Sequence, residues 1–448
     1  MKTLSQMKKK IGFISLGCDK NRVDLEHMMF LVKGSGLEIC ENLVDANVII
    51  INTCAFISSA RVESINTILD IVKSKGNGTL EKIIVTGCLS QKHFNELKES
   101  IPEIDAIIKI NNNENIANEI FGLYDSLPAI HVKNAPCARV LSTPSHYAFL
   151  KISDGCNNCC SYCTIPRIRG KYKSVSMEDL IKEAKALADR GVKELIIIAQ
   201  DTTRYGTDLY GEPKLCELLN EISKIKGIDW IRLHYCYPEM MKDNLIELIS
   251  KNEKICKYID VPFQHISDRI LKNMNRRNTK SEAELLIEKT RAACPQIAIR
   301  STFIIGFPGE TRKDFNELIV FLKKYKLSNV GFFPYSREEG TKACYMKKQI
   351  PEFVKNYRLK KVQKIQTEIM TSICNSRIGE ICDCIIDEYD NINKVFVGRD
   401  KFNSPKIDFN VIINESQQVK VGEIYKIKLV DFKNFNFIGE VYEFTEQN

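Results

Sequence analysis

The sequence predicts an α/β protein in three parts: an N-terminal parallel α/β domain, a central partial (β/α) barrel of the TIM type, and a small C-terminal antiparallel β-barrel. Two observations carry this prediction. Short apolar, β-branched runs alternate with stretches of helical periodicity over most of the 448 residues, a pattern typical of parallel sheets. After Gly379 the pattern changes to short strands separated by Asp, Asn, Gly and Pro, which is typical of a small barrel.

The first domain is expected to span residues 9–125. Its three strand candidates each precede a helical stretch, which indicates parallel βα units. The strands are expected at Ile11–Leu16, Asn47–Ile51 and Lys82–Thr86, and the helices at Val23–Lys33, Ala60–Lys73 and Gln91–Glu99. The segment 126–141, which contains Pro128 and Pro136, is expected to be a linker.

The central domain, residues 142–372, repeats the alternation on a larger scale. Its six strand candidates are Phe149–Ile152, Glu194–Ala199, Trp230–His234, Tyr258–Val261, Ile297–Ile305 and Asn329–Phe333. Six βα units form an open barrel whose functional loops follow the carboxyl ends of the strands. A long basic helix is expected at Glu352–Arg377, and the terminal barrel domain at residues 373–448.

Composition narrows the class of protein. The chain holds 17 cysteines, an odd number, so ligation of a metal or cluster is favoured over a disulfide framework. No apolar run reaches the 18 residues of a membrane span, and a signal-peptide pattern is missing, so we expect a cytoplasmic protein without membrane association. The net charge of +8 fits an acidic partner such as nucleic acid or a ribosome, or simply a lysine-rich surface.

The strongest local motif is a cysteine triplet, Cys156, Cys160 and Cys163, which follows the first strand candidate of the central domain. Three thiolates in one loop can bind three irons of a [4Fe–4S] cubane and leave the fourth iron open to a substrate. The alternative is a structural zinc site, which needs four ligands. Cys159 could supply the fourth, but it abuts Cys160, so we interpret it as a spare thiol.

A second triplet is spread over the first domain. Cys18, Cys54 and Cys88 each come just after an apolar strand candidate. If these strands are parallel neighbours, all three thiols emerge at one sheet edge, where α/β folds place ligands. The alternative is that these are ordinary buried cysteines. Equivalent positions on three strands favour ligation of a second cluster, again with an open iron.

These motifs resemble the radical S-adenosylmethionine methylthiotransferase family. The loop triplet, with Tyr162 before its last cysteine, is similar to the radical signature, and Gly306-Phe307-Pro308-Gly309-Glu310-Thr311 is similar to a turn near bound methionine. The resemblance implies a three-domain layout that ends in a TRAM domain, and two [4Fe–4S] clusters. It also implies two molecules of S-adenosylmethionine: one methylates a cluster-bound sulfur, and the other provides a 5′-deoxyadenosyl radical.

The resemblance further implies cofactor-binding roles for Tyr162, Glu194, Gly306 and Gly309. Glu194 matches a position that contacts the amino group of the substrate, with a solvated acid at a strand edge as the alternative. The Gly306–Gly309 segment alone is also an ordinary turn. No catalytic residue is predicted beyond the cluster ligands, since His265 either lines the barrel mouth or packs in the core.

Within the family, the sequence is similar to the RimO-like branch, which modifies an aspartate β-carbon of small-subunit ribosomal protein S-twelve. The segments that carry this similarity are Ser15–Asn21, Asn52–Ile57, Ala199–Gly206 and Ser404–Asp408. Asp19 departs from the proline expected after the first cysteine. Residues 381–448 hold 12 acidic and 8 basic side chains, and an acidic barrel suits a basic protein better than RNA.

Three hypotheses stay open. The first is a RimO-like enzyme that acts as a monomer on protein S-twelve, free or in the small ribosomal subunit, with a low-potential electron donor. The second is a MiaB-like enzyme that modifies isopentenyl-adenosine in transfer RNA. The third is a non-enzymatic RNA- or ribosome-binding protein with structural clusters.

Overall fold

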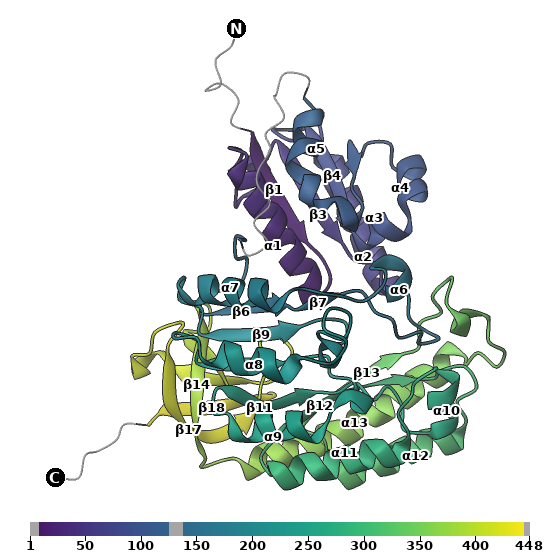
Figure 1. Cartoon of the computed structure of the whole chain (residues 1–448), viewed down its shortest axis with the longest axis vertical. Helices are drawn as coiled ribbons and strands as arrows, with labels where there is room; N and C mark the ends of the chain where they lie inside the picture. Colours follow the sequence, from purple (N-terminus) through teal and green to yellow (C-terminus); the bar gives the residue numbers. More distant parts are fainter. Residues whose placement is uncertain (1–8, 125–137, 443–448) are drawn as a thin grey trace. The chain divides into compact units, whose positions relative to one another are not determined.

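The computed structural model describes residues 9–124 and 138–442, so most of the expected linker lies outside the described residues (Figure 1). The chain divides into two compact units. Unit 1 comprises Met1–Ser142, Asp154–Ala186 and Ser336–Thr341, and unit 2 comprises Thr143–Ser153, Leu187–Tyr335 and Lys342–Asn448. Both cysteine triplets therefore belong to unit 1.

A five-stranded parallel sheet forms the centre of unit 1. Its strands, in spatial order, are β2 (Glu38–Ile39), β1 (Lys10–Ser15), β3 (Val48–Thr53), β4 (Lys82–Gly87) and β5 (Ala106–Ile107). Successive side chains of a strand point to opposite faces. Val48 and Ile50 accordingly pack in one apolar layer, and Ile49 and Ile51 in the other. The three predicted strands are confirmed as parallel neighbours.

Helices cover both faces of this sheet. Residues of α1 (Asp19–Gly34) and α5 (Ile116–Gly122) complete one apolar layer, and residues of α2 (Ser58–Ser74), α3 (Cys88–Lys92) and α4 (Phe94–Ser100) complete the other. Two 3-10 turns, η2 (Leu43–Asp45) and η3 (Ile110–Asn115), lie in the connections. The single helix expected at Gln91–Glu99 is wrong. His93, with a ψ of 39°, interrupts it because that angle is not helical.

The two later segments of unit 1 pack onto the N-terminal sheet and helices. Asp154–Ala186 holds the short helix α6 (Ile165–Ile168), most of α7 (Met177–Ala188) and the two-residue strand β8 (Lys173–Ser174), just after β7 (Ser153–Asp154). Ile168 is buried in the apolar cluster that includes Cys88. In the third segment, the buried carboxylate of Glu338 accepts the Ser58 backbone N–H at 2.7 Å, at the start of α2.

A six-stranded parallel sheet forms the centre of unit 2 (Figure 1). Its order is β13 (Asn329–Pro334), β12 (Ala298–Ile305), β11 (Ile255–Asp260), β10 (Trp230–Leu233), β9 (Glu194–Ile198) and β6 (Tyr147–Lys151). The connecting helices are α8 (Leu215–Ser223), α9 (Asp243–Lys251), α10 (Asp268–Asn273), α11 (Lys280–Ala293) and α12 (Arg312–Tyr325), with 3-10 turns η4 (Thr202–Arg204) and η5 (Pro238–Met240). The sheet stays open between β6 and β13, so the predicted partial barrel is confirmed.

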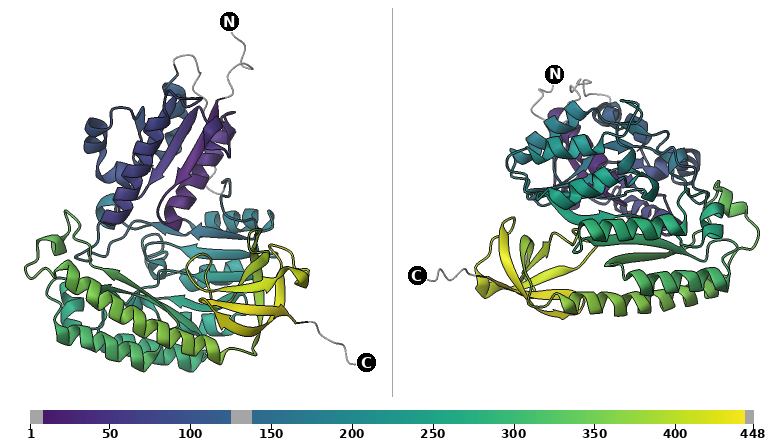
Figure 2. Two further views of the ribbon diagram at one scale, coloured as in Figure 1. Left: turned by 180° about the vertical axis from the view of Figure 1, so that it is seen from behind. Right: turned by 60° about the horizontal axis from the view of Figure 1, so that its bottom comes forward.

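The end of the chain follows the expected plan with one difference. After η6 (Lys342–Tyr345), the long helix α13 (Glu352–Ser376) leads to a closed barrel, drawn in yellow in Figure 2. Its strands are β14 (Ile381–Asp390), β15 (Val395–Asp400), β16 (Asn410–Asn414), β18 (Asn436–Val441) and β17 (Ile424–Lys433), with η7 (Glu415–Gln417) after β16. The barrel is not wholly antiparallel, because β16 and β18 pair in parallel where the ring closes.

No helix within residues 9–124 and 138–442 combines the length and the apolar character that crossing a membrane requires.

Candidate iron–sulfur sites

The N-terminal triplet (Cys18, Cys54 and Cys88) gathers at one edge of the unit 1 sheet, as the sequence predicts. Cys18 directly precedes α1, Cys54 follows β3, and Cys88 begins α3, so each lies at the carboxyl end of a strand. Thr53 and Gly87 pair across β3 and β4 at this edge. Cys54 and Cys88 are buried and Cys18 is exposed. The fold therefore presents two enclosed thiols and one open thiol where α/β sheets bind ligands.

Two glycines allow the three loops to approach one another. Gly17 has a φ of +94° and Gly87 a φ of +97°, a region that favours glycine. A Cβ at Gly17 would lie 3.0 Å from Cys54 Sγ, and a Cβ at Gly87 would lie 2.4 Å from the Thr53 carbonyl oxygen. Both loops therefore press against the end of β3, which draws the thiols together.

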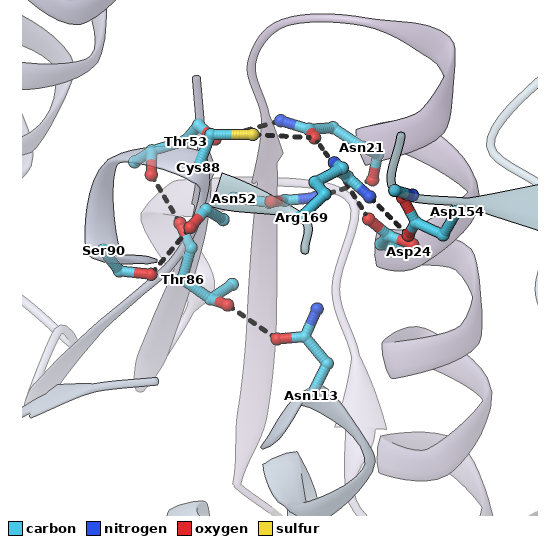
Figure 3. A network of polar contacts seen from close by, with 12 residues as sticks. Asn21, Asp24, Asn52, Thr53, Thr86, Cys88, Ser90, Asn113, Asp154 and Arg169 are labelled. Carbon is cyan, nitrogen blue, oxygen red and sulfur yellow. Dashed lines mark hydrogen bonds and ion pairs between the residues drawn. The ribbon is translucent and has the colours of Figure 1, made fainter. Parts of the chain in front are cut away.

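Buried hydroxyl groups tie the ends of the neighbouring strands to each other (Figure 3). Thr53 donates to the carbonyl oxygen of Thr86 at 2.5 Å, and Thr86 donates to Asn113 Oδ1 at 2.7 Å. Ser90 donates to the carbonyl oxygen of Gly87 at 2.9 Å. The bonds from Thr53 and Ser90 satisfy backbone carbonyls and the bond from Thr86 satisfies a side-chain amide, and together they fix the loop ends next to the cysteines.

Asn21 contacts all three loops of the N-terminal triplet. Its Nδ2 donates to the carbonyl oxygen of Leu16 at 3.1 Å and to that of Thr53 at 2.9 Å. Its Oδ1 accepts the Cys88 thiol at a sulfur–oxygen distance of 3.6 Å. The Asn52 side chain in turn donates to the Asn21 carbonyl at 2.6 Å. This fully buried amide therefore sits at the centre of the site.

Arg169 reaches the same network from the segment that carries the loop triplet (Cys156, Cys160 and Cys163). Its guanidinium donates to Asp154 at 2.8 Å, to Asp24 at 2.9 Å and to Asn21 Oδ1 (Figure 3). Burial lowers the pKa of Arg169, but Asp24 and Asp154 outweigh burial and hold that pKa well above its usual value. Arg169 is therefore a fixed positive charge beside the N-terminal triplet.

Burial sets the acidity of the enclosed thiols. It raises the pKa of Cys88 to about 12, against the opposing charge of Arg169. Burial also raises the pKa of Cys54, against a hydrogen bond from the Phe56 backbone. A thiol of this kind is a poor free nucleophile, whereas a bound metal deprotonates it outright. The environment of both thiols therefore fits ligation of iron.

The loop triplet lies in a backbone shaped for thiolates. Cys156 and Cys160 are buried and Cys163 is half-buried. The backbone N–H of Asn158 donates to Cys156 Sγ, and that of Ile165 donates to Cys163 Sγ, both at 3.4 Å. Hydrogen bonds to ligand sulfurs tune the reduction potential of iron–sulfur clusters. The donors present therefore fit a redox-active cluster.

Cys159 differs from its neighbours because it is exposed, and its thiol lies 3.8 Å from the Asn157 carbonyl oxygen. Within residues 9–124 and 138–442, no three His, Cys, Asp or Glu side chains converge on the position of one metal ion. A structural zinc ion needs four ligands at such a point, whereas in a cubane each thiolate binds a different iron. The chemistry of the donors, three thiolates per triplet, suits two clusters.

The predicted cofactor turn follows β12 in unit 2. Gly306 and Gly309 have φ values of +75° and +83°. Glu310 closes the turn, since its carboxylate accepts the Gly306 N–H at 2.8 Å and pairs with Arg358 at 2.5 Å. His265 Nε2 lies 3.5 Å from the same carboxylate and is fully buried, so His265 packs in the core. The cofactor roles of Gly306, Gly309 and the half-buried Tyr162 stay predictions.

Glu194 lies at the amino end of β9, opposite Tyr147 at the start of β6. Its carboxylate accepts a hydrogen bond from Arg232 at 2.7 Å and also pairs with Arg399. Burial raises the pKa of Glu194, but the charges of Arg399 and Arg232 outweigh burial and hold that pKa below its usual value. The solvated-acid alternative is therefore wrong because the side chain is fully buried. This position favours a structural ion pair, and contact with a substrate amino group stays a prediction.

Comparison with known proteins shows which protein families the chain resembles. Residues 10–109 match the uncharacterized protein family UPF0004, residues 150–322 the radical SAM superfamily, and residues 378–441 the TRAM domain. A protein of Clostridium acetobutylicum called ribosomal protein uS12 methylthiotransferase RimO is 45% identical over 98% of this chain and 100% of its own length. A protein of the same name from Acetivibrio thermocellus is 44% identical over 97% of this chain and 99% of its own length.

This chain belongs to the RimO family. It is accordingly a radical S-adenosylmethionine methylthiotransferase, an enzyme that uses S-adenosylmethionine and an iron–sulfur cluster. Among solved structures, TsrM from Kitasatospora setae, a radical S-adenosylmethionine methyltransferase with cobalamin and a [4Fe–4S] cluster bound, has a TM-score of 0.53 at 12% identity. That match covers 73% of this chain and 75% of TsrM, and it shows a shared fold.

Sequence reasoning missed one residue of this RimO-family site and undervalued another. Arg169 follows the loop triplet within Ile165-Pro166-Arg167-Ile168-Arg169, where one arginine is indistinguishable from the next. Asn21 ends the segment Ser15–Asn21 that carried the RimO-like similarity, but its role depends on contacts with β3 and α3. Asn21 stands among the polar residues Asp19, Lys20 and Arg22, so its position three residues after a candidate ligand was the available signal.

Proposed function

We propose that this enzyme inserts a methylthio group at the β-carbon of an aspartate of ribosomal protein uS12. The observation that carries the proposal is 45% identity over nearly the whole chain to a relative named for that substrate. The six predicted ligands lie in unit 1, and their environments suit thiolates. Because the proposed substrate is a ribosomal protein, the reaction belongs in the cytoplasm.

We infer two [4Fe–4S] clusters, one on each triplet. When bound, they supply the electron that cleaves S-adenosylmethionine and the sulfur that is transferred. The chain contributes two enclosed thiols and the Arg169 charge at the N-terminal triplet, and the Asn158 and Ile165 N–H donors at the loop triplet. Tyr162, Gly306 and Gly309 are the proposed contacts of S-adenosylmethionine.

The proposed reaction consumes two molecules of S-adenosylmethionine. One gives its methyl group to the sulfur atom that is to be transferred and leaves as S-adenosylhomocysteine. The other is cleaved by one electron into methionine and a 5′-deoxyadenosyl radical, which removes a hydrogen atom from the aspartate β-carbon and leaves as 5′-deoxyadenosine. The carbon radical would then bond to the methylated sulfur as the bond from that sulfur to iron breaks, and the remaining electron would stay on the cluster held by Cys18, Cys54 and Cys88. The electron comes from a low-potential donor. We propose that the enzyme works as a monomer on uS12, free or in the small ribosomal subunit.

A deletion strain tests the substrate. Mass spectrometry of uS12 from that strain should show loss of the methylthio mass, and restoration when the wild-type gene returns. Methylthio-adenosine in transfer RNA is measured in the same cells and should persist. Loss of the transfer-RNA modification with uS12 unchanged would establish the MiaB-like alternative instead.

Quantitation of iron and sulfide tests the cofactors. Anaerobically reconstituted protein should hold about eight irons per chain if each triplet binds a cubane. After reduction and addition of S-adenosylmethionine, it should form 5′-deoxyadenosine. About four irons per chain would overturn the two-cluster proposal.

A further inference from the structure

The guanidinium of Arg169 closes the segment that carries the loop triplet. Its Nη1 donates to Asp154 at 2.8 Å. Asp154 stands two residues before Cys156 in the chain, and Arg169 stands six residues after Cys163. The neighbouring carbonyl of Gly170 accepts the Cys156 N–H at 3.1 Å. The two ends of this cysteine loop are therefore held together at Arg169.

The other side of the same guanidinium contacts residues that surround the N-terminal triplet. Nη2 donates to Asp24 on α1 at 2.9 Å and to Asn21 Oδ1 (Figure 3). Asn21 contacts the loops before Cys18 and Cys54, and its Oδ1 faces Cys88 Sγ at 3.6 Å. One side chain therefore connects the two sets of proposed ligands through a single amide.

Burial makes this connection rigid. The Arg169 side chain is 2% exposed and Asn21 is fully buried. Ile168, next in the chain, packs in the apolar cluster that contains Cys88. Hydrogen bonds between charged groups are short and directional, and a buried ion pair often stabilises a fold no better than apolar residues of similar volume. A network of this kind is therefore better explained by the geometry it specifies than by stability.

We propose that Arg169 and Asn21 are positioning residues that hold the two cysteine triplets at a fixed separation. The inference rests on the proposed function, in which hydrogen removal and sulfur transfer meet at one substrate carbon. A misplacement of 1 Å can cost about 10²-fold in rate. If the hydrogen bonds of Arg169 and Asn21 are lost, S-adenosylmethionine is still cleaved, but fewer cleavage events yield methylthio product.

The test uses full-length Asn21→Ala and Arg169→Lys, both reconstituted anaerobically. Asn21→Ala removes the amide and keeps the ion pairs of Arg169 with Asp24 and Asp154. Arg169→Lys keeps the charge, but an ammonium lacks the planar fork that spans three partners. Arg139→Lys is the matched control, because Arg139 is also buried in unit 1 between two acids, Glu26 and Glu183, at 3.2 and 3.1 Å.

Three quantities are measured in each protein: iron content, the ratio of methylthiolated uS12 to 5′-deoxyadenosine, and the magnetic interaction between the two reduced clusters by electron paramagnetic resonance. We expect Asn21→Ala and Arg169→Lys to keep the iron content and to lower the product ratio at least tenfold. The magnetic interaction should change in both variants, whereas Arg139→Lys should match the wild type in all three quantities.

An unchanged ratio and an unchanged magnetic interaction in Asn21→Ala would overturn the proposal, and so would loss of iron from a variant that is otherwise folded. If Arg169→Lys fails to fold, Asn21→Ala still decides, since it leaves the ion pairs intact. Failure of the proposed function is distinguishable, because wild-type enzyme would then lack 5′-deoxyadenosine, uS12 product or a second cluster.

Discussion

The two cysteine triplets offer similar ligands but are assembled in different ways. The loop triplet lies within eight consecutive residues, Cys156–Cys163, and its geometry comes from one loop. The N-terminal triplet takes one cysteine from the end of each of three strands, β1, β3 and β4. A local site depends on its own backbone, whereas a distributed site depends on the register of a whole sheet. The comparison teaches that loss of a ligand from one triplet should disrupt only the site on that triplet, although Arg169 and Asn21 connect the two.

The sharpest test of this independence removes one ligand from each triplet. Cys160→Ala should lower 5′-deoxyadenosine formation to background, a loss beyond the roughly 100-fold that even outer-shell changes at metal sites produce. Cys88→Ala should keep 5′-deoxyadenosine formation and stop methylthio transfer, because it leaves the loop triplet whole. Both products are quantified by mass spectrometry in one reaction. Equal loss of 5′-deoxyadenosine in the two variants would refute the division of roles.

Substitution of a backbone glycine near each triplet should affect only the triplet that it adjoins. Gly87 has φ 97° and ψ −159°, and a Cβ there would lie 2.4 Å from the Thr53 carbonyl oxygen. A Cβ at Gly155, with φ +74°, would lie 2.2 Å from the Lys171 carbonyl oxygen. We expect each alanine variant to lose about 3 kcal/mol of unfolding free energy from strain and clash. Gly87→Ala should lose iron from the N-terminal triplet, and Gly155→Ala from the loop triplet.

Gly36→Ala is the matched control for both variants. Gly36 has a φ of +86°, but nothing lies within 4 Å of a Cβ built there. It should lose about 1 kcal/mol from the left-handed backbone alone and retain all its iron. Urea unfolding and iron analysis of the three variants check the prediction. Equal destabilisation by Gly36→Ala and Gly87→Ala would contradict the prediction, because it would show that close packing at the strand ends adds nothing to the cost of a Cβ at Gly87.

The fold was predictable where the hydrophobic periodicity extends over many residues. Six βα alternations in the central domain and three in the first domain have strong periodicity, and the strands lie within a few residues of the expected positions. The two-residue strands β2 and β5 are too short for any periodicity. The break at His93 and the parallel pairing of β16 with β18 depend on tertiary packing, which propensity does not contain.

The common position of the candidate ligands was predictable from the sequence, whereas the contacts that support them were not. A strand followed by cysteine can be seen in the sequence, so the shared edge of Cys18, Cys54 and Cys88 could be inferred from strand order. The role of Arg169 could not be predicted, because its partners Asp24 and Asn21 lie 145 and 148 residues away in the chain. Glu194 is a different case. Its match to a family position at the start of a strand predicts contact with a substrate amino group, and that contact stays a prediction. The sequence could not show that two arginines of unit 2 pair with its carboxylate.

A smaller effect on the unfolding free energy should come from Asp105, a carboxylate near the N-terminal triplet. Asp105 accepts hydrogen bonds from Lys75 at 2.6 Å and from the Ile83 N–H at 2.8 Å, next to the strand that leads to Cys88. Burial raises the pKa of Asp105, but the bonds from Lys75 and the Ile83 N–H outweigh burial and hold that pKa below its usual value. At pH 7, Asp105→Asn should therefore lower the unfolding free energy by about 1 kcal/mol.

The pH dependence follows from the direction of that shift. Because the folded pKa of Asp105 lies below the unfolded value of about 3.9, the carboxylate stabilises the fold above that pH and ceases to as pH falls through the folded pKa. The gap between wild type and Asp105→Asn should close on acidification, as followed by urea unfolding. Asp70→Asn, which removes an exposed i,i+3 partner of Lys73, is the control and should change little at any pH. A gap that persists at low pH would contradict the prediction.

The smallest expected effect concerns Cys159, which lies between the cysteines of the loop triplet in the sequence but differs from its neighbours in solvent exposure. Its side chain is exposed, whereas Cys156 and Cys160 on either side are buried. Cys159→Ser should therefore leave iron content unchanged and 5′-deoxyadenosine formation within about twofold of wild type, since exposed substitutions away from a site have small effects. The measurement discriminates well because each cubane accounts for about four irons. Loss of about four irons in Cys159→Ser would make it a ligand, and the spacing of the loop triplet would then have to be reassigned.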